Sequence, residues 1–258
     1  MSARSSMATL WALMRRAVNE VVRVPGAAIP AILAPAIFML GITAVFGKLT
    51  VLPGFTSESY MTFIIAISLL QGAGFTGAAT GVNLARDIEQ GWFDRLLASP
   101  APRWVLLLGT VLSASMRSLM PMTVLLVVGF ALGVDFPGFD GLALAILLVA
   151  LFSAVIAFYA IALALRFRTQ QAAPLMQAGT FMAVLFTTSY APLDLLEGWL
   201  HDVAEVNPVT KVVEAVRQGF VADVTWADTW PGLVALAGLG VVLGALALRG
   251  MARTAERG

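Results

Sequence analysis

The chain contains no cysteine, a single histidine and few charged residues of either sign. Without cysteine, a disulfide framework, thiolate catalysis and cysteine-ligated metal sites are excluded. Charged residues make up 12% of the 258 residues, with a formal net charge of +1, whereas soluble domains carry about 25%. So little charge could not cover the surface of one or two soluble domains of this length.

Apolar residues take the place of the missing charge. Hydrophobic residues make up 59% of the chain, and the mean hydropathy is +0.89. A membrane crossing needs about 20 apolar residues. Six runs meet that length: 27–47, 59–83, 104–132, 140–165, 172–191 and 229–249. We therefore predict an all-α polytopic membrane protein with six transmembrane helices, in which residues 1–258 form a single transmembrane domain.

The cations are distributed unevenly between the two sides of this predicted bundle. Twelve of the sixteen fall on the side of the termini: Arg4, Arg15, Arg16, Arg23, Arg86, Arg95, Arg103, Arg166, Arg168, Arg249, Arg253 and Arg257. Lys48, Lys211 and Arg217 fall on the other side, and Arg117 lies within a run. Cytoplasmic loops carry an excess of Lys and Arg. We expect both termini and the loops 84–103 and 166–171 to be cytoplasmic.

The first 24 residues are interrupted by charge and read as an amphipathic helix in the cytoplasmic interface. Trp11 would lie at headgroup depth, and Pro25 would end the helix. The alternative is a loose cytoplasmic tail.

Residues 86–100 form the most charged cytoplasmic segment, in which apolar and charged side chains alternate. The pattern predicts a short amphipathic helix. Such a helix could lie on lipid, or it could insert spaced apolar anchors into a groove on a soluble partner.

The longest non-spanning segment, 191–228, is expected on the outer face. It predicts two short amphipathic helices, over 191–200 and 207–217, that rest on the outer leaflet or dip into it as a re-entrant hairpin. Asn207 suits the N-cap of the second helix and Pro208 its first turn. Leu196 and Leu200 are spaced by one helical turn, and Lys211 and Glu214 sit one turn apart.

Motifs of soluble catalytic proteins are not convincing here. Gly72 to Gly77 satisfies G-x-G-x-x-G but lies in the middle of an apolar run, without a preceding strand. There is no Walker A sequence, and His201 reads as solvated surface. Spacings of small residues predict close contacts between helices: Gly77 with Gly81, Gly129 with Gly133, and Gly240 with Gly244.

Arg117 is the one charge well inside a run. It could snorkel to the interface, face a protein-lined cavity, or mark a later start of the third span, and we favour the cavity. No carboxylate lies in the middle of a run, which argues against proton-coupled transport.

Two segments carry a resemblance to a known family. They are Asp87-x-x-x-Gly-x-x-x-Arg-Leu-Leu-Ala-Ser-Pro-x-x-Arg103 and Tyr190-Ala-Pro-Leu…Gly-Trp-Leu…Asn-Pro-Val…Ala-Val-Arg217. With the six runs and the N-terminal helix, they resemble the ABC-2 type transporter permeases. Within that family the chain is similar to the daunorubicin-resistance-type drug exporter permeases and to the nodulation-factor and polysaccharide exporters.

The resemblance implies a membrane subunit of an ATP-driven exporter in the cytoplasmic membrane of a prokaryote. It has no catalytic site, and ATP and Mg²⁺ belong to a separate ATP-binding-cassette ATPase subunit. Its other partners would be a second permease, identical or homologous, and the lipid bilayer, with no nucleic acid. The segment that docks on the ATPase would comprise Asp87, Glu89, Gly91, Trp92, Phe93, Asp94, Arg95 and Leu96.

The resemblance also implies a substrate path between two permeases, lined largely by spans two and five. The positions carried over are Gln71, Phe75, Arg117, Phe181, Met182 and Phe186, for which ordinary helix packing is an equal alternative. The outer gate would comprise Leu196, Trp199, Leu200, Asn207, Pro208 and Arg217. Few aromatics in span five favour an amphiphilic drug, lipid or glycolipid. The alternatives are a polysaccharide or oligosaccharide exporter, a non-ATP secondary transporter, and a structural scaffold.

Overall fold

The computed structural model describes residues 29–55, 57–97 and 102–255, where the regular structure is helical. Five helices are long and apolar enough to cross a membrane: α2 (Ile29–Phe46), α3 (Tyr60–Glu89), α5 (Arg103–Ala131), α6 (Gly138–Phe167) and α10 (Trp226–Ala255). The chain is therefore a polytopic membrane protein, as expected. The helix predicted over residues 1–24 lies outside the described residues.

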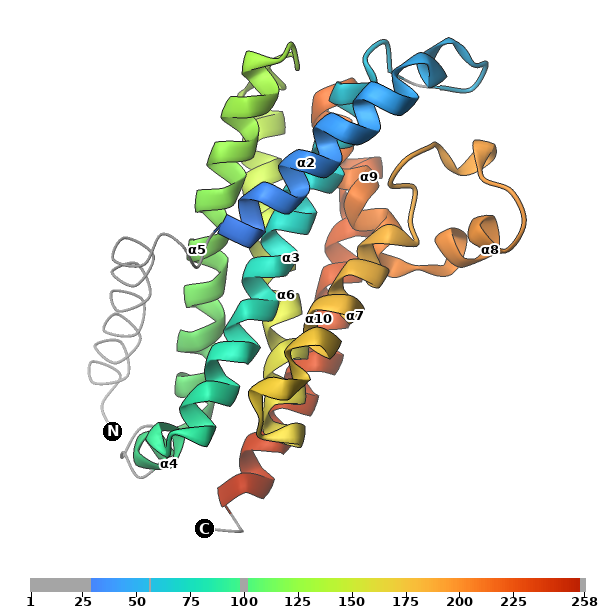
Figure 1. Cartoon of the computed structure of the whole chain (residues 1–258). Coiled ribbons are helices and arrows are strands. Elements are labelled where there is room, and N and C mark those ends of the chain that lie inside the picture. Colours follow the sequence, from blue (N-terminus) through green and yellow to red (C-terminus); the bar gives the residue numbers. More distant parts are fainter. Residues whose placement is uncertain (1–28, 56, 98–101, 256–258) are drawn as a thin grey trace.

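Helix α3 is the central helix of the bundle. It packs against α2, α5, α6, α7 and α9, and most of its side chains are buried. In Figure 1, α2 runs obliquely across the long helices, and α3, α5, α6 and α10 lie side by side. The bundle has two ends, which we call the Tyr60 end and the Glu89 end after the two ends of α3.

Close packing of α3 on α6 depends on two glycines. A Cβ atom on Gly77 would lie 2.7 Å from the Ser153 carbonyl oxygen, and one on Gly81 would lie 2.5 Å from the main chain of Ala160. The predicted helix contact at this pair is confirmed.

The other two glycine spacings do not form such contacts at both glycines. Gly129 fits tightly against Ile65, but Gly133 has a φ of +96° and open space around it. Gly240 and Gly244 meet side chains of α6 only at ordinary van der Waals distances. The predicted close contact is confirmed at Gly129, against Ile65 of α3, but not at Gly133, Gly240 or Gly244, because the spacing does not show how closely a partner helix approaches.

The fifth predicted span is not one long helix. Helix α7 follows the short helix η3 (Gln170–Ala172) and covers only Ala173–Leu185, 13 residues, or about 20 Å at 1.5 Å per residue. That is less than the hydrocarbon core of about 30 Å. Residues 186–190 continue without regular structure. The segment still follows α3, because Gln170 bonds to Glu89 and the Tyr190 carbonyl accepts a hydrogen bond from Tyr60.

The segment after α7 also differs from the prediction. It contains η4 (Leu193–Leu195), α8 (Trp199–Val206) and α9 (Pro208–Val221). Leu196 is in an extended conformation before α8 begins, so Leu196 and Leu200 do not share a helical face. In Figure 1, α8 projects from the side of the bundle.

Helix α9, in contrast, is an internal element. It packs against α3, α6 and α10, and most of its side chains are buried. Its backbone approaches both long neighbours closely, at Gly219 against Gly141 of α6 and at Ala215 against Gly232 of α10. Burial of α9 favours the hairpin alternative over a helix resting on the surface.

Candidate functional site

The predicted coupling segment forms a separate short helix at the Glu89 end. Gly91, with a φ of +72°, reverses the chain between α3 and α4 (Trp92–Leu97), a conformation that glycine adopts without steric cost. Trp92 is 57% exposed, and the Arg95 guanidinium lies 5.7 Å from the centre of its ring. A flat aromatic side chain with a cation beside it is therefore presented to the exterior.

The side chain of Phe93 is buried in the bundle. It is 2% exposed and packs in a cluster with Ile88 of α3, Leu106 and Leu107 of α5, and part of Leu96. The expectation that Phe93 contacts the ATPase is not supported, because the side chain anchors α4 to the bundle. The side chain of Asp94 lies outside the description, and Asp87 is half-buried and has contacts of its own.

Glu89 binds the turn between α6 and α7. Its carboxylate accepts hydrogen bonds from the Thr169 hydroxyl (2.7 Å), the Gln170 main-chain N–H (3.0 Å) and the Gln170 side-chain amide (2.6 Å). Nε of Arg86 in turn donates to Oε1 of Gln170 (3.3 Å). The sequence predicted a rim position for Glu89 but gave no sign of Thr169 and Gln170, which lie 80 residues away.

The side chains predicted to line a substrate path lie in different environments. Gln71 is buried, and among the described residues its side-chain amide has no hydrogen-bond partner, whereas Phe75 is half-buried. Met182 of α7 is 49% exposed. Two rings make specific contacts, Phe181 at 5.8 Å from Phe38 of α2 and Phe186 at 5.5 Å from Trp199.

Arg117 faces another helix. Its guanidinium donates to the Thr80 hydroxyl of α3 at 2.8 Å, and the side chain is half-buried. Arg117 therefore lies in the α3–α5 interface, mid-way along α5, which excludes a later start of the third span. The protein-lined cavity stays a prediction.

The helix break after α7 is stabilised by side chains that bind the freed carbonyls. The hydroxyls of Thr187 and Ser189 both donate to the Val184 carbonyl, at 2.7 and 2.6 Å. Short hydroxyl side chains offer the backbone such alternatives to a helix. The Asn207 amide donates to the carbonyls of Ala183 (2.9 Å) and Phe186 (2.7 Å). The end of α7 is thus bound by residues from outside its own helix.

Asn207 also begins α9, as predicted. Its side-chain oxygen accepts from the Val209 N–H at 3.0 Å, and Pro208 is the first helical residue. One side chain therefore joins the C-terminus of α7 to the N-terminus of α9. The predicted cap is confirmed, whereas its amide contacts to α7 were not foreseen.

The side chain of Arg217 in α9 contacts the non-helical segment that follows α7. The side chain is 6% exposed. It donates to the carbonyls of Phe63 (3.1 Å), Thr188 (2.5 Å) and Ser189 (3.5 Å). Of the six predicted gate residues, Asn207 and Arg217 are brought together at the break, whereas Trp199 is exposed and Leu196 and Leu200 are half-buried.

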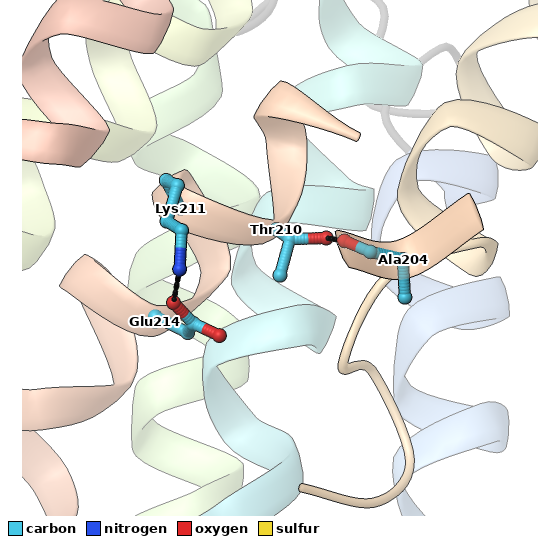
Figure 2. Close-up of polar contacts among 4 residues, drawn as sticks. All are labelled: Ala204, Thr210, Lys211 and Glu214. Atoms are coloured by element: carbon cyan, nitrogen blue, oxygen red, sulfur yellow. Dashed lines mark hydrogen bonds and ion pairs between the residues drawn. The ribbon is translucent and has the colours of Figure 1, made fainter. Parts of the chain in front are cut away.

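A third contact fixes the corner between α8 and α9. The buried Thr210 hydroxyl donates to the Ala204 carbonyl at 2.6 Å, and Lys211 pairs with Glu214 at 2.9 Å (Figure 2). The predicted Lys211–Glu214 proximity is confirmed.

His201 lies 3.5 Å from Asp202, and both side chains are exposed. Within the described residues, no group of three His, Asp or Glu side chains is placed to hold a metal ion.

Comparison with known proteins identifies the family. Residues 8–221 match the family model of the ABC-2 type transporters. The chain belongs to this family. Among its relatives are the probable multidrug ABC transporter permease YbhR of Escherichia coli K12, 27% identical over 168 residues, and the putative transport permease ycf38 of Cyanophora paradoxa, 26% identical over 211 residues. The probable doxorubicin resistance ABC transporter permease protein DrrC of Mycobacterium tuberculosis H37Rv is 27% identical over 195 residues.

Coverage differs between these relatives. The alignment with YbhR covers 62% of this chain and 45% of YbhR. The alignment with ycf38 covers 81% of this chain and 72% of ycf38. The alignment with DrrC covers 73% of this chain and 68% of DrrC. The chain thus spans less than half the length of YbhR. The 258 residues contain no Walker A sequence.

Proposed function

We propose that this chain is the permease subunit of an ATP-binding-cassette exporter that moves an amphiphilic substrate across the cytoplasmic membrane of a prokaryote. A separate ATPase subunit would bind ATP and Mg²⁺ and supply the energy. The observation that carries the proposal is α4, a short helix anchored by buried Phe93 that presents Trp92 outward. Exposed aromatic residues next to an Arg are typical anchors of protein interfaces.

The charge distribution supports a cytoplasmic location of α4. Exposed arginines gather at the Glu89 end, where α4 lies: Arg86, Arg95, Arg103, Arg166, Arg168, Arg249 and Arg253. By the positive-inside rule this end faces the cytoplasm, where a soluble ATPase would be available for docking.

Six crossings would follow if α7 and residues 186–190 together make the fifth. This segment follows α3 from Glu89 to Tyr60, and its unwound part is enclosed by α3 and α9. Non-helical backbone is tolerated at membrane depth where protein encloses it. Both termini would then be cytoplasmic.

The substrate class rests on α7 and on the named relatives. Helix α7 carries the exposed Met182 and the half-buried rings of Phe181 and Phe186, which suit an apolar or amphiphilic molecule. Two of the relatives are named for multidrug transport and doxorubicin resistance. A drug or lipid passing beside α7, between this permease and a second one, fits both observations.

The experiment is co-purification from the native membrane with an ATP-binding-cassette ATPase, identified by mass spectrometry and by ATP hydrolysis. Trp92→Ala should weaken the affinity of the permease for the ATPase by about 30-fold, equivalent to about 2 kcal/mol. Less ATPase should therefore be retained per permease. Trp104→Ala is the matched control, because Trp104 is 52% exposed at the same end and should leave retention unchanged. Equal retention in both variants, or none in the wild type, would contradict the proposal.

A further inference from the structure

The carboxylate of Glu89 occupies an unusual place in the fold, between the proposed docking helix and the beginning of α7. It is the last residue of α3, and only Gln90 and Gly91 separate it from α4. On its other side it accepts three hydrogen bonds from Thr169 and Gln170. These bonds join the end of α3 to the turn before α7, beside the wider packing of α3 against η3 and α7.

The bonded groups belong to the start of α7. Thr169 caps η3, its hydroxyl oxygen accepting from the Gln171 N–H at 3.2 Å, and η3 continues directly into α7. The Gln170 N–H is one of the unpaired donors at this helix start. A carboxylate placed there is favoured both by these donors and by the helix dipole. Glu89 therefore caps η3, the turn that leads into α7, from a different helix.

The chain before Thr169 leads directly out of α6. Helix α6 ends at Phe167, and Arg168 adopts a left-handed conformation with a φ of 56°. The turn from α6 to α7 is therefore short and sharply reversed. A displacement of α3 at Glu89 would be passed to Gln170 through the hydrogen bonds, and to this turn also through α6, which packs closely on α3.

We infer that Glu89, Thr169 and Gln170 form a clasp that transmits movement of α4 to α7. The inference rests on the proposed function, because it takes α4 as the ATPase contact and α7 as a wall of the path. The resemblance placed Glu89 in the docking segment, but its carboxylate is bound by Thr169 and Gln170, so in this account Glu89 is a positioning residue and the docking contact belongs to Trp92. Loss of the clasp would leave ATPase binding at α4 intact. Movement of α4 would then no longer be transmitted to α7.

The hydrogen-bond pattern permits a rescue design. In Gln170→Glu two carboxylates oppose each other, and in Glu89→Ala the acceptor is missing. The double variant Glu89→Gln/Gln170→Glu exchanges the groups: the Gln oxygen still accepts from Thr169 and the 170 N–H, its amide donates to the new carboxylate, and Arg86 pairs with that carboxylate. Gln90→Ala is the control, because Gln90 is exposed and adjacent to Glu89.

The readout is the movement of α7. The chain has no cysteine, so Met182→Cys supplies its single thiol, and labelling by N-ethylmaleimide in the complex with the ATPase is read on the separated permease. Trapping with ATP and vanadate should change the labelling rate by about threefold or more, within the range that coupling networks contribute. In Glu89→Ala and Gln170→Glu this response should be lost while ATPase retention and basal ATP hydrolysis persist. The exchanged pair and Gln90→Ala should respond as the parent does.

Other outcomes would overturn the clasp. A full response in Glu89→Ala, no response in the parent, or no rescue by the exchanged pair would each remove it. Loss of the ATPase together with the response in Glu89→Ala would mean that these contacts serve assembly alone. If no ATPase is retained by the wild type, the proposed function itself fails, which is a separate result.

Discussion

The guanidinium of Arg217 lies 3.7 Å from the centre of the Phe63 ring. Its direct hydrogen-bond partners are three main-chain carbonyls, one from Phe63 itself and two from the unwound segment after α7. The face of an aromatic ring attracts a cation, and carbonyl oxygens supply the rest of the compensation. One buried cation thus holds α3, α9 and the unwound segment together.

Replacing Arg217 should therefore destabilise the fold. Arg217→Ala leaves the buried carbonyls of Thr188 and Ser189 without this donor, at an expected cost of about 2–4 kcal/mol. Lys211→Ala, which removes an exposed pair on the same helix, should change stability by less than about 0.5 kcal/mol. Unfolding by SDS in mixed micelles measures both. Equal stability of the two variants would show that the carbonyls find other donors.

Asn207→Asp separates the two roles of Asn207. Aspartate is as good an N-cap as asparagine, so the start of α9 is preserved. The amide that donates to Ala183 and Phe186 is lost, and a carboxylate faces their carbonyls. We expect a loss of about 1–3 kcal/mol, and a smaller loss for Asn207→Ser, which keeps a cap without the repulsion. The same SDS titration measures it, and an Asp variant as stable as wild type would contradict the link to α7.

Phe93 and Trp92 should behave in opposite ways although they are adjacent. Phe93→Ala removes a buried ring and should cost about 3–5 kcal/mol of the packing that holds α4 in place, whereas Trp92→Ala should cost less than about 0.5 kcal/mol. Limited trypsin digestion at Arg95 reports this directly. Cleavage should accelerate in Phe93→Ala alone, and comparable rates in the two variants would refute the anchoring role.

Gly81→Ala tests the contact between α3 and α6. The added Cβ would meet the main chain of Ala160, which cannot move without shifting the helix, so we expect a loss of about 1–3 kcal/mol or more. Gly41→Ala in α2 is the control, because a Cβ there meets nothing within 4 Å, and alanine should gain up to about 1 kcal/mol in helix propensity. Thermal unfolding in detergent ranks them, and a neutral Gly81→Ala would argue against the tight fit.

Single cysteines test the orientation of the bundle. In intact cells an impermeant thiol reagent should label Asp202→Cys, on the exposed side of α8, and should label Gln90→Cys only after permeabilisation. The reason is that the Arg-rich Glu89 end is expected to face the cytoplasm. Labelling of Gln90→Cys in intact cells, with Asp202→Cys protected, would invert the proposed topology.

The long helices could be predicted from the sequence because lipid and core both demand uninterrupted apolar runs. The observed bounds of α2, α5 and α6 fall within two residues of the runs marked beforehand, while α3 and α10 continue six residues beyond them. The Asn207 cap was equally local, since an N-cap depends on residues two or three positions away.

The break at Leu185 was not predictable in the same way. Residues 172–191 are apolar on average, and hydroxyl side chains are compatible with a membrane helix. What decides the break is a set of donors 20 to 30 residues later, Asn207 and Arg217, which no local pattern connects to α7. Glu89 and Gln170 are a similar case, with 81 residues between them.

The interior position of Phe93 could not be read from its neighbours either. Adjacent residues of a helix point about 100° apart, so either Trp92 or Phe93 could have faced inward. The choice is made by Leu106 and Leu107 of α5, which follow α4 in the sequence. Amphipathic character predicted the helix but left its rotation open.

The shortness of α7 has a consequence for biogenesis. A 13-residue helix followed by unpaired carbonyls is a poor substrate for insertion by itself, because hydrocarbon satisfies none of those groups. The donors that satisfy them, Asn207 and Arg217, leave the ribosome only after α7 has been made. Residues 173–190 are therefore expected to reach their final depth late, once α9 has packed against α3 and α6. A chain truncated before α9 would hold its four preceding spans while this segment remained uninserted.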